Sequence, residues 1–300
     1  MCSVSGGSRQ DPVSPATKAR RQLCRECAAV FAIALVVRVL ASVVVRSPGY
    51  IDAYYYFHAG ARVAAGVGLT ETVAWNYLTP PPNLPRPAGA YWPPGAAIIA
   101  AAGLVTFAGS RSVPRGALAW RAVQVFPVLL SAAVAAGAYV AARRLTPGAG
   151  ERRRATTVAG LVILSGVYFP YWVTTDTFTP FALLGGAALW LSAEAASHTR
   201  SGVGLVALAS FLAGLSQLVR PDAALLLVAP IVAVACRPRH RERVQSAKCK
   251  VQSEEISEYR RGCGARGKSG SLDARPMILV AVVIAFVAGL TPWLLRNWLT

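Results

Sequence analysis

Long apolar runs separated by short polar segments dominate the pattern of the chain. Runs of about 17–25 apolar residues have the length that a helix needs to cross a hydrocarbon core of ~30 Å. The clearest of them, five single runs and one proline-broken pair, are residues 24–45, 119–142, 155–173, 179–196, 277–295, and 203–219 with 223–236. The pattern therefore predicts an all-α polytopic membrane protein with about seven transmembrane helices.

An eighth, shorter apolar run at residues 94–109 decides the topology. If it crossed the membrane, one basic cluster would lie on the opposite side of the membrane from the basic N-terminus. This cluster comprises Arg143, Arg144, Arg152, Arg153 and Arg154. Such an arrangement contradicts the tendency of Lys and Arg to stay on the cytoplasmic side. We therefore expect short helices that lie on the membrane within one long outer loop, residues 46–118, and a cytoplasmic N-terminus.

Composition divides the chain into four parts. Residues 1–22 form a basic cytoplasmic tail, residues 23–236 the transmembrane core, and residues 277–300 the final span. Residues 237–276 are polar, basic and rich in Gly, Ser and Arg, which is typical of a disordered cytoplasmic insertion. The sequence stops directly after the last span, as a fragment of a longer protein would.

Charge and cysteine content exclude two other classes. The formal net charge is +18, but the basic residues form short clusters between apolar runs, which indicates orientation in a membrane and not nucleic-acid binding. Cys24 and Cys27 have the spacing of metal ligands, yet no second pair or histidine lies nearby. We expect a multi-pass protein of a bacterial inner membrane, without structural disulfides.

A lone acid stands in the stretch GYIDAYYYF after the first span. Tyr and Trp favour the membrane interface, so an aromatic belt accounts for Tyr54 and its neighbours. It does not account for Asp52, because a carboxylate beside hydrocarbon needs a partner or a function. His58 follows six residues later and is predicted to be an interfacial histidine without a catalytic role.

Three further charged residues are predicted at the same outer face. Asp176 is either a cap that accepts hydrogen bonds at a helix start or a site residue, and both alternatives stay open. Arg220 precedes a proline inside an apolar stretch, where an arginine costs about 2.5–3.5 kcal/mol, and a bound phosphate would offset this cost. Arg296 lies at the outer end of the last span and is a second candidate for binding phosphate.

The order of these motifs resembles the polytopic C-type glycosyltransferases, especially the bacterial branch related to protein O-mannosyltransferases and the lipid A aminoarabinose transferase. The resemblance covers nearly the whole chain except residues 1–22 and 237–276. It implies that Asp52 is the acid of the first outer loop and that Asp176 and Arg220 are the second acidic and the arginine positions. It also implies that Tyr91, Pro93 and Pro94 form the family's proline-bearing entry to the apolar segment at 94–109. Many relatives carry a second acid after the first, where this chain has Ala53.

The resemblance implies that the sugar donor is carried on a polyprenyl phosphate. The acceptor would be a protein, a lipid or a glycan. No cofactor is firmly implied. Asp52 is expected to act as the general base, and the two arginines to bind the phosphate. A divalent cation held by Asp52 and Asp176 is an alternative. The rival functions are a secondary transporter, for which Arg38 within the first span is the main argument, and an assembly protein without catalysis.

Overall fold

The protein is an all-α chain, as the sequence predicts. The structure is a computed structural model that describes residues 14–72, 84–87, 92–108, 116–165, 170–197, 202–236 and 275–299. Its α-helices are α1 (Pro15–Val44), α2 (Ile51–Ala64), α3 (Gly95–Ala108), α4 (Gly116–Leu145), α5 (Glu151–Ile163), α6 (Phe178–Ser197), α7 (Gly202–Gln217), α8 (Val228–Ala235) and α10 (Arg275–Leu299). Two 3₁₀ helices, η1 (Pro170–Val173) and η2 (Pro221–Leu227), and a short antiparallel pair, β1 (Thr70–Glu71) and β2 (Arg86–Pro87), complete the described elements.

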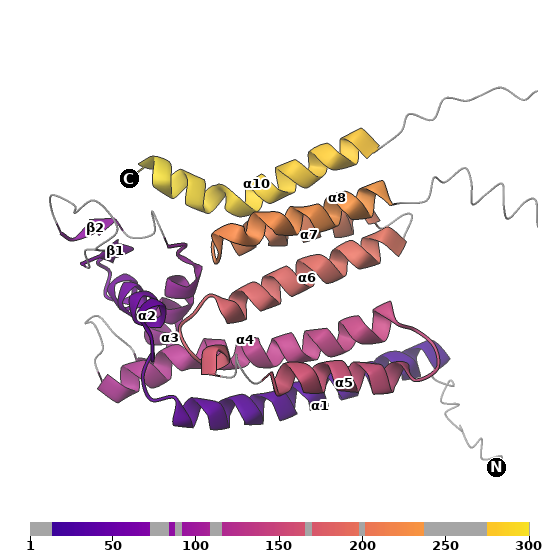
Figure 1. The fold of residues 1–300 in the computed structure, drawn as a ribbon, viewed down its shortest axis with the longest axis horizontal. Helices are drawn as coiled ribbons and strands as arrows, with labels where there is room; N and C mark the ends of the chain where they lie inside the picture. The colour runs from indigo at the N-terminus through magenta and orange to yellow at the C-terminus, as the bar shows by residue number, and fades with distance from the viewer. Residues whose placement is uncertain are drawn as a thin grey trace, which may run out of the picture.

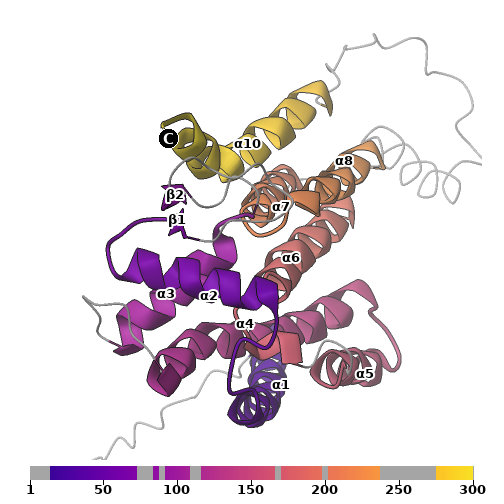
Figure 2. The ribbon, with the colours of Figure 1, turned by 60° about the vertical axis from the view of Figure 1, so that its left-hand side comes forward.

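The long helices lie side by side along the long axis of the molecule. Helix α6 packs between α4 and α7, α10 packs on α7, and α1 packs on α4 (Figure 1). Helices α2 and α3 and the two strands gather at one end of this bundle (Figure 2). We call this the α2 end and the other the basic end.

Three helices within the described residues are long and apolar enough to cross a membrane: Ala16–Val44, Gly116–Leu145 and Pro276–Leu295. Large apolar side chains on their surfaces are exposed, for example Ile33, Leu40 and Ile284. Such surfaces are stable against lipid and not against water. These three helices therefore have the length and the apolar surface of membrane-spanning helices.

One predicted boundary is wrong. Residues 155–173 do not form one helix: α5 ends at Ile163, and the described chain resumes as η1 at Pro170. The predicted basic tail, residues 1–22, includes the start of α1, which begins at Pro15. Its start is capped by Ser14, whose hydroxyl oxygen accepts a hydrogen bond from the Thr17 N–H at 3.3 Å. The predicted disordered insertion, residues 237–276, lies almost wholly outside the described residues.

The short helix α3 belongs to the α2 end. It packs on α2 and on α4, and the Gly95 N–H donates a 2.6 Å hydrogen bond to the Leu218 carbonyl at the end of α7. With 14 residues, α3 is about 21 Å long, shorter than a hydrocarbon core of ~30 Å, as is α5 with 13 residues, so the location of α3 and not its length bears on the topology. This placement agrees with the expected outer loop that contains short helices.

The basic clusters near the N-terminus and after α4 lie together at the basic end. Glu26 of α1 forms ion pairs with Arg143 of α4 and, at 3.2 Å, with Arg152 of α5. The Tyr139 hydroxyl donates a 2.6 Å hydrogen bond to the same carboxylate. The sequence expectation that these clusters share one side is confirmed for α1, α4 and α5.

Helices α7 and α10 cross at a point where only glycine fits. A Cβ atom on Gly214 would overlap the carbonyl oxygen of Phe286, and one on Gly289 would lie 2.5 Å from the Phe211 oxygen. We expect Gly214→Ala to destabilise the protein by about 1–3 kcal/mol through overpacking. Gly204→Ala in the same helix, where no atom lies within 4 Å of the added Cβ, is the matched control. Thermal unfolding in detergent measures both, and equal midpoints would contradict this packing.

Candidate functional site

Asp52 lies in the first turn of α2, close to the end of α1. The end of α1 is fixed by α4, because Trp120 Nε1 and Gln124 Nε2 donate hydrogen bonds of 2.8 and 3.0 Å to the Val45 carbonyl. Gly49 then adopts a φ of +86°, a left-handed conformation that glycine allows at low cost and that turns the chain into α2. The local sequence therefore holds the Asp52 carboxylate at the α2 end of the bundle.

The Asp52 carboxylate is half-buried, and burial raises its pKa above the ordinary value for aspartate. Desolvation disfavours the charged form of a carboxyl group. A carboxylate with a raised pKa that is still ionised at neutral pH is a better proton acceptor than an ordinary one. Burial therefore increases the affinity of the Asp52 carboxylate for a proton.

Asp176 lies in the loop before α6 and is 6% exposed. Its carboxylate accepts hydrogen bonds from the Thr177 and Phe178 N–H groups and, at 3.0 Å, from the Thr177 hydroxyl. These bonds tie the Asp176 carboxylate to the two residues that follow it, at the point where α6 begins. Burial nevertheless raises the pKa of Asp176, while the nearby positive charge of Arg220 acts in the opposite direction.

Arg220 lies between α7 and η2 and is held by three groups. Its Nε and Nη2 atoms donate hydrogen bonds of 3.0 and 3.1 Å to the two carboxylate oxygens of Asp222. The guanidinium carbon lies 5.4 Å from the ring centroids of both Phe178 and Phe181 of α6. The side chain is 31% exposed, so it is partly accessible from outside the protein. Asp222 thus orients this arginine.

Tyr56 connects these charged groups and was not predicted as a site residue. It is 1% exposed and lies four residues after Asp52, on the same face of α2. Burial and the negative charge of Asp52 raise the pKa of its hydroxyl, whereas the positive charge of Arg220 lowers it. Tyr56 therefore lies within electrostatic range of both Asp52 and Arg220. The spacing of four residues from Asp52 was the sequence signal that could have identified it.

Two threonines of the stretch TTDT tie the Asp176 loop to α2. The Thr175 hydroxyl donates a 2.7 Å hydrogen bond to the Ala53 carbonyl, and the Thr174 hydroxyl donates one of 3.3 Å to the Pro48 carbonyl. Both threonines are buried. They hold the segments that carry Asp52 and Asp176 next to each other.

We expect Thr175→Val to destabilise the protein by about 1 kcal/mol, because a buried hydrogen bond is lost without a large change in volume. Thr156→Val is the matched control, since the exposed Thr156 hydroxyl bonds only to the Arg152 carbonyl of its own helix. Thermal unfolding compares the two variants. An equal effect at both positions would show that the bond to Ala53 contributes no more than a surface bond.

Pro93 and Pro94 are buried at the start of α3, next to the turn that carries Arg220. Trp92 packs near the rings of Tyr55 and Tyr56, with centroid separations of 6.3 and 6.4 Å. The predicted site residue Tyr91 lies outside the described residues. The proline-bearing segment thus meets the α2 end as expected.

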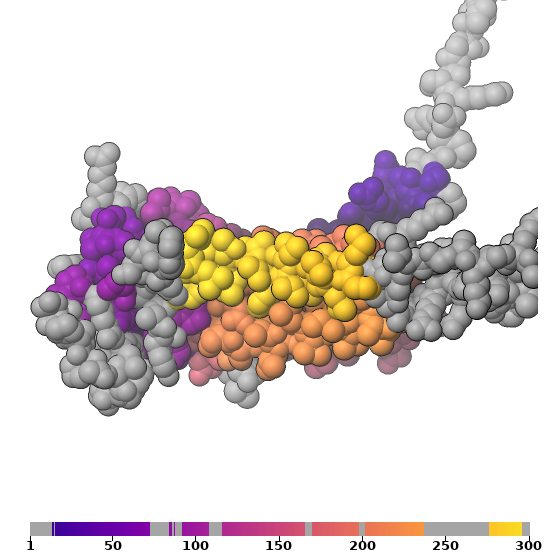
Figure 3. All heavy atoms as spheres, turned by 90° about the horizontal axis from the view of Figure 1, so that it is seen from above, coloured from indigo at the N-terminus to yellow at the C-terminus, as the bar shows by residue number. Residues whose placement is uncertain are grey.

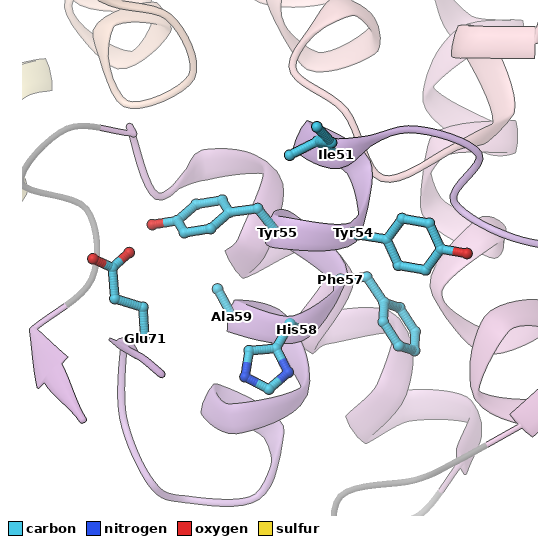
Figure 4. A pocket seen from close by; sticks show the side chains of 7 residues that line it. All are labelled: Ile51, Tyr54, Tyr55, Phe57, His58, Ala59 and Glu71. Atoms are coloured by element: carbon cyan, nitrogen blue, oxygen red, sulfur yellow. The ribbon is translucent and has the colours of Figure 1, made fainter. Parts of the chain in front are cut away.

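Tyr54 lies apart from this cluster. It is 52% exposed and lines a cavity of about 450 Å³ on the outer face of α2. The other lining residues are Ile51, Tyr55, Phe57, His58, Ala59 and Glu71, and Figure 4 shows Tyr54 and Phe57 on one side of α2 and Tyr55 pointing toward Glu71. His58 lies 3.1 Å from the Thr72 hydroxyl, and burial lowers the pKa of its ring, with a smaller effect from the Arg62 charge.

Arg296 is near the C-terminal end of α10, and its side chain is not among those described. Figure 1 shows this end of α10 at the α2 end of the bundle. As for metals, the described residues contain no group of three or more His, Cys, Asp and Glu side chains that could hold an ion. A cation at Asp52 and Asp176 would compete with the helix-start N–H groups for the Asp176 carboxylate.

No family model matches the chain, and no curated protein or solved structure is significantly similar to it. Any function must therefore be argued from the arrangement of residues at the α2 end.

Proposed function

We propose that the protein is a membrane glycosyltransferase that moves a sugar from a polyprenyl phosphate to an acceptor at the extracytoplasmic face. The observation that carries this proposal is the convergence of Asp52, Tyr56, Asp176 and Arg220 at one end of a bundle of apolar helices. These residues come from three widely separated segments. Two of these side chains, Tyr56 and Asp176, are buried, and a buried ionisable group beside apolar helices is costly without a partner or a function.

Each group has a role in the proposed reaction. The acceptor oxygen or nitrogen attacks the anomeric carbon, and the bond from this carbon to the phosphate oxygen breaks with its electron pair going to the phosphate. The acceptor proton passes to the Asp52 carboxylate. Arg220 stabilises the negative charge that develops on the departing phosphate, and Arg296 is proposed to do the same. Attack opposite the phosphate inverts the configuration of the anomeric carbon.

The proposal includes the topology expected from the sequence: seven crossings by α1, α4, α5 with η1, α6, α7, η2 with α8, and α10, with the α2 end outside. The ion pairs of Arg143 and Arg152 with Glu26 place the basic cluster after α4 beside the N-terminal part of α1. This supports the proposed topology, because basic clusters stay on the cytoplasmic side. The location of α3 at the α2 end supports it as well.

The transporter alternative loses its main argument. Arg38 is fully buried in the bundle, where its Nη2 donates a 3.0 Å hydrogen bond to the Val162 carbonyl. Its guanidinium carbon lies 5.3 Å from the centroid of the Trp172 ring. These contacts give Arg38 a structural role that needs no transported ion.

Labelling of single cysteines tests the topology. In a cysteine-free background, we expect Arg46→Cys and Asp222→Cys to react with a membrane-impermeant maleimide added to intact cells. Ala149→Cys, at an exposed position of the turn between α4 and α5 at the basic end, should react only after the cells are opened. Labelling of positions 46 and 222 from opposite sides would refute the proposed site.

Sugar transfer itself is tested with the purified protein in liposomes that contain a polyprenyl phosphate carrying a radiolabelled sugar. The reaction should yield labelled acceptor and free polyprenyl phosphate in equal amounts when membrane fractions supply the acceptor. Label that enters sealed vesicles without leaving its carrier would favour transport, and no movement of label at all would favour an assembly protein.

A further inference from the structure

The first three turns of α1 carry a basic face that the proposed reaction does not use. A cavity of about 500 Å³ at this face is lined by Thr17, Arg20, Arg21, Cys24 and Arg25. Spacings of three and four residues place all five on one side of the helix. The three arginines are exposed, and within the described residues none has an acidic partner.

The opposite side of the same turns holds α1 to the bundle. Glu26 lies about half a turn away from the basic face, and its carboxylate accepts bonds from Arg143, Arg152 and Tyr139. Among the described acids of this end, Glu151 also pairs with Arg143, at 2.9 Å. The acids near this end are thus occupied on the inner side, while the basic face points outward. Figure 3 shows the indigo end of α1 projecting from the bundle, at the end opposite to α2 and α3.

Helix length sets the depth of this face in a membrane. The 30 residues of α1 extend about 45 Å, whereas the hydrocarbon core is ~30 Å thick. If the apolar part of α1 fills the core, the turns that carry the three arginines extend into the headgroup layer. The phosphate groups of anionic lipids lie in this layer.

We infer that this basic face binds the phosphate headgroup of anionic phospholipids of the cytoplasmic leaflet. Arginine guanidinium groups bind phosphate through paired, charge-assisted hydrogen bonds, and the Thr17 hydroxyl adds a donor. The apolar surface of α1 that continues the Arg25 side of the helix, where Ala32 and Val36 are exposed, would contact the acyl chains. The charge and the neighbouring apolar surface both match a lipid better than a soluble anion.

Titration of the purified full-length protein in neutral detergent with short-chain phosphatidylglycerol and phosphatidylcholine, read by native mass spectrometry, tests this inference. We expect tighter binding of phosphatidylglycerol. Arg21→Gln should weaken it about fivefold, and the Arg20→Gln, Arg21→Gln and Arg25→Gln triple variant on the order of a hundredfold. Arg46→Gln, at the other end of the same helix, is the charge-matched control and should bind as the unchanged protein does.

Two further arms complete the experiment. Arg21→Lys should recover most of the binding because it restores the charge, and circular dichroism should show the same helix content in every variant. Equal affinity for the two lipids, unchanged binding by the triple variant, or an equal loss in Arg46→Gln would overturn the inference. Displacement of phosphatidylglycerol by equimolar inorganic phosphate would also overturn it, since the site would then bind any phosphate. None of these outcomes depends on sugar transfer.

Discussion

Replacement of Asp52 by asparagine is expected to lower the rate of sugar transfer by a factor of about 10²–10⁴. Asparagine keeps the size of the side chain but cannot accept the proton of the attacking acceptor. The binding groups remain, so the loss should appear in kcat and less in the KM for the lipid donor. The transfer assay in liposomes measures both quantities.

Stability should change in the other direction. The pKa of Asp52 is raised in the folded protein by burial, so folding favours the protonated form. Its charge therefore weakens folding once the pH exceeds the ordinary pKa of aspartate, and the effect is complete above the raised folded value. The uncharged Asp52→Asn protein should unfold at the same temperature as the unchanged protein, or higher, at pH 7.

The pH profile of transfer follows from the same shift. A general base must be ionised, so the rate should fall as the pH decreases through the raised pKa of Asp52. The lower limb of the profile should therefore lie above the pH expected for an ordinary aspartate.

Asp222→Asn is the matched control for Asp52→Asn, because it also changes an acid to an amide at the α2 end. Its carboxylate pairs with Arg220, and this bond lowers the pKa of Asp222, so it is not suited to act as a base. Transfer by Asp222→Asn should keep the pH profile of the unchanged protein. If Asp52→Asn retains full kcat, Asp52 is not the base and the proposed mechanism is wrong.

Local sequence patterns predicted much of this architecture. Apolar runs of sufficient length gave the positions of α1, α4, α6, α7 and α10 to within a few residues, except at the start of α1. The break before Pro221 followed from the missing N–H group of proline. The distribution of arginines placed residues 94–109 in the outer loop, and α3 lies at the expected end.

Contacts between distant segments could not be predicted in this way. The approach of Tyr56 to Arg220 joins segments more than 150 residues apart, and the bond from Thr175 to Ala53 joins the loop before α6 to the first turn of α2. The interruption of residues 155–173 was missed because an apolar run looks the same whether or not its helix is continuous. Apolar periodicity specifies which residues avoid water but not which side chains meet.

The pairing of Arg220 with Asp222 gives the second prediction. Arg220→Gln is expected to weaken binding of the polyprenyl phosphate donor about 10- to 150-fold. This factor corresponds to the loss of hydrogen bonds to a charged group, which contribute about 1.5–3 kcal/mol to the binding free energy. The carboxylate of Asp222 now neutralises part of the guanidinium charge. Asp222→Asn should therefore leave donor binding intact or tighten it, although the guanidinium is less firmly oriented.

Opposite effects of these two substitutions separate a phosphate-binding arginine from a structural one. If the ion pair served only to hold the start of η2, each substitution would break the same two hydrogen bonds, and both variants would lose stability with no difference in donor affinity. Arg220→Lys refines the result: an ammonium keeps the charge but not the two parallel N–H donors, so donor affinity should be intermediate. Donor binding measured by titration with polyprenyl phosphate should thus follow the order Asp222→Asn, unchanged protein, Arg220→Lys, Arg220→Gln. Equal affinity in all four would mean that the phosphate is bound elsewhere at the α2 end.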